Sequence, residues 1–174
     1  MRYYVKRQEN ILKWLLDSDP SIRWQALNCL TNSSKSKILA ERKRIAFDGW
    51  GAQLLSYQGS DGKWADSLYS RKWISTTYTM MLLKNLGLVP GHKQATKACK
   101  VLLDEGLYED GGINYFYQYN HSETCVTGIV LSILAYYQLE DSRIKSLVTH
   151  LIKQQMSSYV KKKIKKEHPF RNFV

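Results

Sequence analysis

The stretch LLSYQGSDGKW, residues 54–64, decides how the chain is interpreted. It begins like the end of a helix and continues into a turn in which Gln58 and Trp64 bracket Asp61 and Gly62. A glycine allows a turn backbone without steric cost, and a glutamine can bond the polar groups that a helix end leaves unpaired. We therefore expect a helix, a tight turn and a second helix here.

The surroundings of this stretch recur further along the chain. At an offset of 49, Asp61-Gly62 falls on Asp110-Gly111, which Gly112 follows. At an offset of 48, Leu54-Leu55 falls on Leu102-Leu103, and four inner positions, Thr76, Thr79, Leu83 and Leu86, fall on Thr124, Thr127, Leu131 and Leu134. A fixed period of this length is typical of repeats that bury their faces by stacking on their neighbours.

Two kinds of predicted helix alternate along these repeats. Residues 38–57, 93–106 and 141–156 carry charges on one side, whereas residues 73–83 and 124–139 carry none. A helix without charge on any side is buried on several sides, so we expect an order of outer and inner helices. In the first outer helix, the apolar side consists of Phe47, Trp50, Leu54 and Tyr57. No strand pattern of period two appears, so the fold class is all-α.

The chain divides into three parts. Residues 1–34 read as an N-terminal helical hairpin, in which Asp19 is the N-cap and Pro20 the first residue of the second helix. Residues 35–156 hold two full repeats and one partial repeat. The basic tail, 157–174, holds six Lys and Arg residues against one Glu, and we expect it to be disordered or a frayed helix end.

The motif around Gln58 and Trp64 resembles the glutamine–tryptophan repeat of squalene and oxidosqualene cyclases. The segments 73–88 and 122–128 are similar to inner helices of bacterial prenyltransferase-like proteins, which share the terpenoid-cyclase α/α-toroid fold. The resemblance covers residues 10–156 and implies a partial α/α toroid. It also implies a C-terminally truncated form, because the repeat pattern of the sequence stops at Met156.

The residues that carry chemistry in this family have few counterparts. The Asp-x-Asp-Asp motif of class II cyclases and the Asp-Asp-x-x-Asp motif of class I synthases do not occur. Protein prenyltransferases bind zinc through Asp-x-Cys and a distant His, and the nearest match is Glu123 with Cys125, next to His121. The competing interpretation is that Glu123 is a first-turn acid and Cys125 a small buried residue. We predict no cofactor, with zinc at these three residues as the alternative.

The net charge and the cysteines indicate which partners and which location to expect. A net charge of +11 over 174 residues allows a nucleic-acid or lipid partner, but the excess on the tail has a simpler explanation as a solvated chain end, so we expect no nucleic-acid binding. Three widely spaced cysteines, Cys29, Cys99 and Cys125, indicate reduced thiols and a cytoplasmic protein. The longest uncharged stretch, residues 124–139, is too short and too mixed in composition to span a bilayer, so we expect no transmembrane segment.

Two hypotheses for function follow. The first is a non-catalytic repeat protein of the prenyltransferase and squalene cyclase type, because two repeats can form only an arc and not a closed cavity. The second is an isoprenoid- or lipid-binding protein, or a terpenoid-active enzyme, completed by a partner or by homo-oligomerisation through the open end of the repeats. The loop Tyr115–Tyr119 bears on the second, since aromatic faces stabilise cations, although it can equally plug a helix end.

Overall fold

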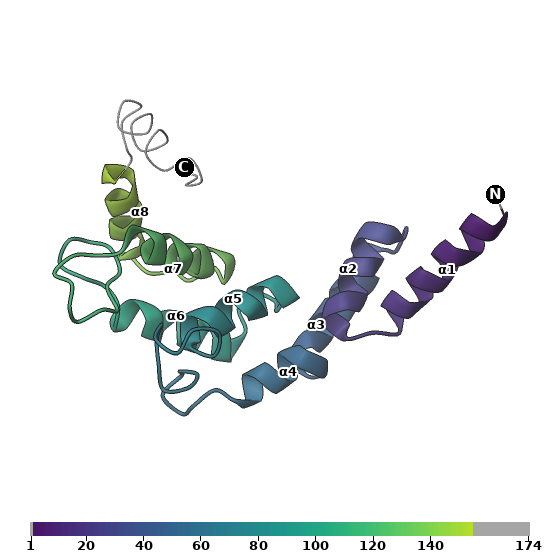
Figure 1. Cartoon of the computed structure of the whole chain (residues 1–174), viewed down its shortest axis with the longest axis horizontal. Coiled ribbons are helices and arrows are strands. Elements are labelled where there is room, and N and C mark those ends of the chain that lie inside the picture. The colour runs from purple at the N-terminus through teal and green to yellow at the C-terminus, as the bar shows by residue number, and fades with distance from the viewer. Residues whose placement is uncertain (1, 155–174) are drawn as a thin grey trace.

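The computed structural model describes residues 2–154, with side chains from residue 9 onward. This part of the chain is helical and contains no strand, only two isolated bridges, which confirms the all-α class. Figure 1 shows the helices following one another along an open arc. They are α1 (Arg2–Leu16), α2 (Pro20–Leu30), α3 (Lys35–Lys43), the 3₁₀ turn η1 (Arg44–Ala46), α4 (Gly49–Ser56), α5 (Thr76–Leu86), α6 (Lys93–Asp104), α7 (Thr124–Tyr136) and α8 (Ile144–Lys153).

The predicted start of α2 is confirmed. The Asp19 carboxylate accepts a hydrogen bond from the Ser21 backbone N–H (2.8 Å), and Pro20 occupies the first helical position. The other oxygen of Asp19 accepts from the Trp50 N–H (2.7 Å), which lies in the first turn of α4. One carboxylate therefore caps α2 and also ties α4 to it.

The predicted single helix over 38–57 is wrong. The chain leaves the α-helix after Lys43, makes a 3₁₀ turn and begins α4 at Gly49, which has a φ of +69°. A side chain at Gly49 would meet Asp19, since a Cβ there would lie 2.8 Å from the Asp19 Cγ. The break lets α4 approach Asp19, and glycine is the residue that permits this backbone at this separation.

The break also changes which side of this segment is buried. Phe47, Trp50 and Tyr57 are 84%, 53% and 64% exposed, so the predicted apolar side faces solvent at these positions. Ile45, Gly51 and Leu55 are buried instead. The reason is rotational, because residues before and after a helix break no longer share one face.

The two Asp-Gly turns have the same backbone. In the first, the Gly59 N–H donates to Lys63 O and the Gly62 N–H to Gly59 O; in the second, the Tyr108 N–H donates to Gly112 O and the Gly111 N–H to Tyr108 O. Gly62 and Gly111 have φ values of +94° and +87°. The offset between the turns is 49 residues, as the sequence predicts.

The inner helices α5 and α7 match at a different offset. The Trp64 N–H donates to the Thr76 hydroxyl (3.0 Å), and the Ile113 N–H donates to the Thr127 hydroxyl (2.8 Å). The helix ends agree, since Leu88 N–H bonds Leu83 O and Leu139 N–H bonds Leu134 O. Both comparisons give an offset of 51, so the predicted pairing at 48 is wrong by three residues. Apolar residues recur every three to four positions, so the sequence pattern survives such a slip.

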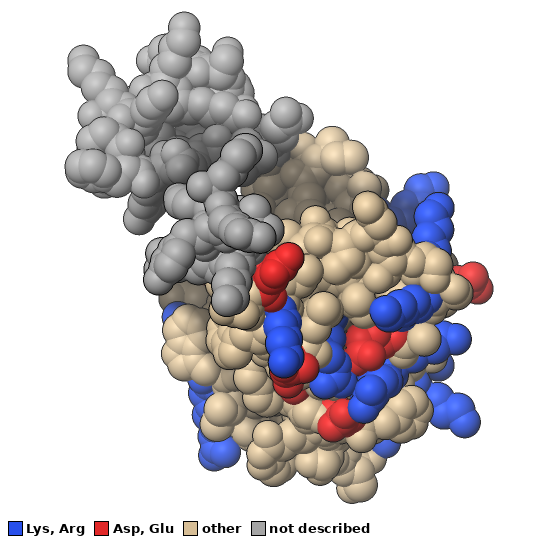
Figure 2. Space-filling view, turned by 90° about the vertical axis from the view of Figure 1, so that its right-hand side faces the viewer, with Lys and Arg blue, Asp and Glu red and all other residues tan. Residues whose placement is uncertain are grey.

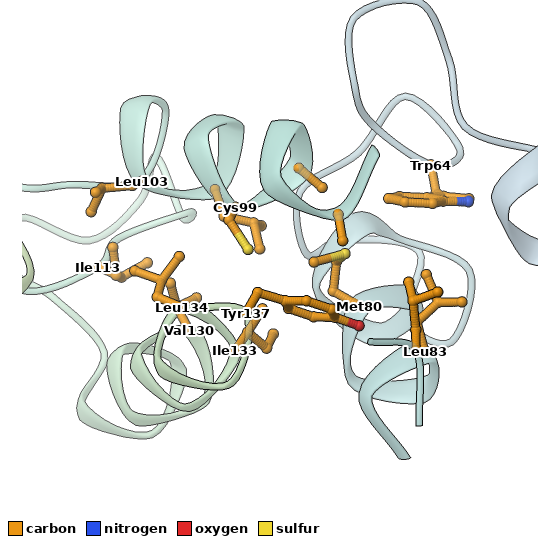
Figure 3. Packing of buried hydrophobic residues seen from close by; sticks show 14 of the residues in the cluster. Trp64, Met80, Leu83, Cys99, Leu103, Ile113, Val130, Ile133, Leu134 and Tyr137 are labelled. Carbon is orange, nitrogen blue, oxygen red and sulfur yellow. The ribbon is translucent and has the colours of Figure 1, made fainter. Parts of the chain in front are cut away.

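The core lies between α5, α6 and α7, as Figure 3 shows. Its buried side chains include Met80, Leu83, Cys99, Leu103, Val130, Ile133, Leu134 and Tyr137. Burial on this scale supplies most of the stability of short helices, which are marginal alone.

Charged side chains of both signs are mixed on the face that Figure 2 draws. Arg23 pairs with Glu41 (2.6 Å) between α2 and α3, and Arg44 pairs with Asp48 (3.0 Å). None of the helices in the described part of the chain is long and apolar enough to cross a bilayer. The predicted basic tail, 157–174, lies outside the described residues.

Candidate functional site

The first predicted motif, Gln58 to Trp64, forms the joint between α4, α5 and α6. The Gln58 side chain donates to Gly62 O (2.9 Å) and to Gln94 O (3.0 Å), so it links the turn to the first turn of α6. The Asp61 carboxylate accepts from the Lys63 N–H (3.0 Å), which shapes the turn. These contacts hold the backbone between neighbouring helices.

The last turn of α4 receives its partners from this joint. The buried Trp64 indole donates to Leu54 O (2.7 Å), and the Gln94 amide donates to Leu55 O (2.9 Å). Carbonyls in the last turn of a helix lack intrahelical partners, so these two bonds cap α4. The predicted capping role therefore belongs to Trp64 and Gln94, whereas Gln58 bonds carbonyls elsewhere.

The second predicted motif, Asp110-Gly111-Gly112, binds the loop before α7. Asp110 accepts from the Gly112 N–H (3.1 Å), the Ser122 N–H (2.9 Å) and the Ser122 hydroxyl. Burial alone would raise the pKa of Asp110, but the hydrogen bonds from Ser122 and Gly112 lower it below its ordinary value. Gly112 is needed for this packing, since a Cβ there would lie 2.6 Å from the Ser122 Cβ.

Tyr115 takes over the capping bond that Trp64 makes in the first repeat. Its hydroxyl donates to Leu102 O (2.8 Å), the carbonyl at the position equivalent to Leu54 O. The ring fills the space beside Gly106, where a Cβ would lie 2.9 Å from the Tyr115 Cζ. The sequence places Ile113 near the Trp position; Ile113 matches the backbone of Trp64, but Tyr115 makes the equivalent side-chain bond.

His150 is a buried residue to which the sequence assigns no role. It is 4% exposed, and its Nδ1 lies 3.2 Å from Asp110 O. Its Nε2 is buried without a hydrogen-bond partner. His150 thus joins α8 to the second turn. The helix pattern gave no signal for this burial, because Leu147 precedes His150 by three residues but Ser146 and Lys153, on the same face, are polar.

The three residues predicted as zinc ligands lie at the start of α7 and in the loop before it. His121 and Cys125 are exposed, and Glu123 lies at the N-cap position of α7 without a side-chain capping bond. Among residues 9–154, no group of three or more His, Cys, Asp or Glu side chains could hold a metal ion. The competing expectation that Cys125 is buried is wrong, because the thiol faces solvent.

A run of aromatic side chains links the loops that precede α5 and α7. We call Tyr69, Trp73, Tyr78, Phe116 and Tyr119 the aromatic cluster. Trp73 lies 5.3 Å from Tyr78, Tyr78 lies 5.3 Å from Tyr69, Tyr69 lies 5.5 Å from Phe116, and Phe116 lies 5.8 Å from Tyr119, measured between ring centroids. The two ends of the run, Trp73 and Tyr119, are 78% and 43% exposed.

The loop of residues 65–75 holds the first half of the cluster in a strained backbone. Ala65, Asp66, Arg71 and Trp73 all have positive φ values, between 49° and 76°. Such conformations cost about 1–3 kcal/mol each and persist where the surroundings enforce them. Here the buried Thr76 and Thr77 hydroxyls, at the start of α5, bond Ser67 O and Leu68 O (2.7 Å each).

A groove between α5 and α7 adjoins this cluster. Its volume is about 330 Å³, and its lining residues are Met81, Lys84, Asn85, Cys125, Gly128, Ile129 and Ser132. Tyr78 precedes the lining residue Met81 by one turn of α5, and Cys125 is the second residue of α7, so the aromatic cluster lies toward the end of the groove at which α7 begins. The hydrogen bond from the Tyr78 hydroxyl (3.2 Å) and burial raise the pKa of Tyr69 to about 12.

Lys84 marks the other end of the groove. Its ammonium donates to the Ser132 hydroxyl and lies 5.9 Å from the centre of the Tyr136 ring. The arrangement is an apolar strip with a cation at one end and aromatic rings at the other. Sequence reasoning missed Lys84, although a charge in an otherwise uncharged inner helix was a signal that could have found it.

Three comparisons with known proteins found no match to this chain. No model of a protein family, no curated protein and no solved structure matches it.

Proposed function

We propose that this chain is a non-catalytic helical-repeat protein that binds an elongated apolar ligand with an anionic end, of the isoprenoid diphosphate class, in the groove between α5 and α7. The observation that carries the proposal is the groove itself, with Lys84 at one end and the aromatic cluster at the other.

The finer fold assignment belongs to the same proposal. We propose a partial α/α toroid, in which α5 and α7 are inner helices and α4, α6 and α8 outer ones. The matched Asp-Gly turns 49 residues apart support it, as does the packing of α6 on the first turn and of α8 on the second. Lys97 contacts Gly62, and Ser146, 49 residues later, contacts Gly111.

The chemistry of the groove suits such a ligand. Met81 and Ile129 provide apolar surface, which favours a hydrocarbon chain by about 25 cal/mol for each Å² removed from water. Lys84 provides a compact cation for a phosphate group. A volume of about 330 Å³ lies at the lower end of small-molecule pockets. The aromatic rings extend the apolar surface beyond the groove.

Binding without reaction is proposed because the sequence lacks both carboxylate motifs by which terpenoid synthases and cyclases start their reactions. The groove is also open on one side, so water reaches a bound chain. Carbocation chemistry needs a site from which water is excluded.

Calorimetric titration of the full-length protein tests this function. The probes are farnesyl diphosphate, farnesol and inorganic pyrophosphate. We expect farnesyl diphosphate to bind, and Lys84→Met to weaken its binding about tenfold, since about 1.4 kcal/mol of charge-assisted bonding is lost. Farnesol binding should not change.

Lys93→Met is the matched control, because Lys93 is exposed on α6 outside the groove. If both variants lose the same affinity for farnesyl diphosphate, the probe is attracted by the net positive charge of the protein and not by the groove. Absence of heat with every probe contradicts the proposal. Formation of a hydrocarbon product, detected by gas chromatography, would favour the terpenoid-active alternative instead.

A further inference from the structure

A second groove lies on the opposite side of α5, between α4 and α5. It has a volume of about 330 Å³, and its lining residues are Trp50, Gln53, Leu54, Tyr57, Leu82 and Leu86. Trp50, Tyr57 and Leu82 are 53%, 64% and 43% exposed, and none of the six residues carries a charge. The first repeat thus presents an uncharged, largely apolar surface to solvent.

The same surface is covered in the second repeat. At the offset of 48 that relates α4 to α6, Trp50 and Leu54 correspond to Ala98 and Leu102, which are both fully buried. At the offset of 51 that relates α5 to α7, Leu82 and Leu86 correspond to Ile133 and Tyr137, which are 1% and 3% exposed. Figure 3 shows Met80 of α5 beside the ring of Tyr137, so α5 covers this surface of the second repeat.

The complementary surface is open at the other end of the repeats. In the first repeat, Thr77 and Met80 of α5 are fully buried. Their counterparts in α7 are Gly128 and Leu131, which are only half-buried. A Cβ on Gly128 would meet no atom within 4 Å. At these positions, the described part of the chain therefore presents both sides of the repeat interface without covering either of them.

We propose that a second copy of this chain docks in the α4–α5 groove through the Gly128–Leu131 face of its α7, in the way that α5 covers α6 and α7 within one chain. Trp50 is the anchor of this interface, since large aromatic side chains in apolar pockets dominate binding energy. The two faces differ, so the association is head to tail and can continue to further copies.

Charge sets the conditions for this association. The chain carries a net charge of +11, and like charges on two copies repel each other. Added salt screens this repulsion, because the Debye length falls from about 8 Å at 0.15 M to about 3 Å at 1 M. Apolar association therefore strengthens with sodium chloride, whereas contacts made by ion pairs would weaken.

Sedimentation velocity of the full-length protein from 5 to 200 µM, at 0.15 M and 0.5 M sodium chloride, measures the association. The variant Leu82→Glu places a carboxylate in the α4–α5 groove, and Gly128→Glu places one on the docking face of α7, at a residue that also lines the α5–α7 groove. Leu39→Glu is the control, since Leu39 on α3 is 45% exposed, close to the 43% of Leu82. Circular dichroism melting shows whether each variant is folded.

We expect each of the two interface variants to raise the dissociation constant at least 100-fold and Leu39→Glu to leave it within threefold. An equimolar mixture of Leu82→Glu and Gly128→Glu should form dimers, because the groove of one and the α7 face of the other remain intact. A monomeric wild-type protein at 200 µM overturns the proposal. So does a pattern in which Leu82→Glu abolishes association and Gly128→Glu has no effect, which indicates groove-to-groove pairing.

Discussion

The hydroxyl of Tyr115 offers the sharpest test of how the repeats are joined. It donates to Leu102 O over 2.8 Å, in the last turn of α6, where a carbonyl lacks a helical partner. Burial raises the pKa of Tyr115 well above its usual value, so the neutral phenol persists at all moderate pH values. The substitution Tyr115→Phe removes this one oxygen and keeps the ring beside Gly106.

The expected loss follows from leaving a buried carbonyl unpaired, which costs about 1–3 kcal/mol. We take about 2 kcal/mol, which lowers the melting temperature of a protein of this size by roughly 4–8 °C. Urea unfolding followed by circular dichroism at pH 7 measures the free energy of unfolding directly.

Tyr117→Phe is the matched control, because it deletes the same atom in the same loop from a side chain that is fully exposed. Surface changes of this kind stay within about 0.5 kcal/mol. If Tyr115→Phe destabilises the protein no more than Tyr117→Phe, the hydrogen bond from Tyr115 to Leu102 O does not stabilise the fold, and Tyr115 is not the energetic counterpart of Trp64.

Two further predictions concern packing and pH. Gly106→Ala should destabilise the fold by about 1–3 kcal/mol, since the new Cβ would lie 2.6 Å from Leu102 O. Gly128→Ala should stabilise the fold by about 0.5–1 kcal/mol, because a Cβ there meets no atom within 4 Å and alanine favours a helix over glycine. Equal shifts of the urea midpoint in the two variants would contradict both predictions. Burial raises the pKa of Cys99 to about 12 from 9.0, so the unfolded chain loses this proton first and the free energy of unfolding should fall between about pH 9 and 12, by up to about 1.4 kcal/mol per pH unit. Urea titrations across that range check the fall, and Cys99→Ala should make it shallower; identical slopes for both proteins would count against it.

The sequence predicted the structure correctly where neighbouring residues alone determine the backbone conformation. Asp19-Pro20 predicts the start of α2 correctly, and the two Asp-Gly turns recur at the predicted 49-residue spacing with the same hydrogen bonds. A capping carboxylate and a glycine with positive φ act within a few residues, so their effect is readable without the rest of the chain.

The sequence was uninformative where the answer depends on which face meets a neighbour. The apolar residues Phe47, Trp50 and Tyr57 predict a buried side, yet they are exposed because the helix breaks at residues 44–48. The offset of 51 between α5 and α7 was missed for a related reason, since an amphipathic pattern repeats after one helical turn.

The candidate site shows the same division. The sequence by itself determined an all-helical chain with two copies of one turn, because turn geometry and helix periodicity are local properties. Only the tertiary structure decided that Lys84 and Cys125 share a groove, that Tyr69, Trp73 and Phe116 form one cluster, and that Cys125 is exposed. These outcomes depend on how separate helices pack, and packing is set by contacts between residues far apart in the chain.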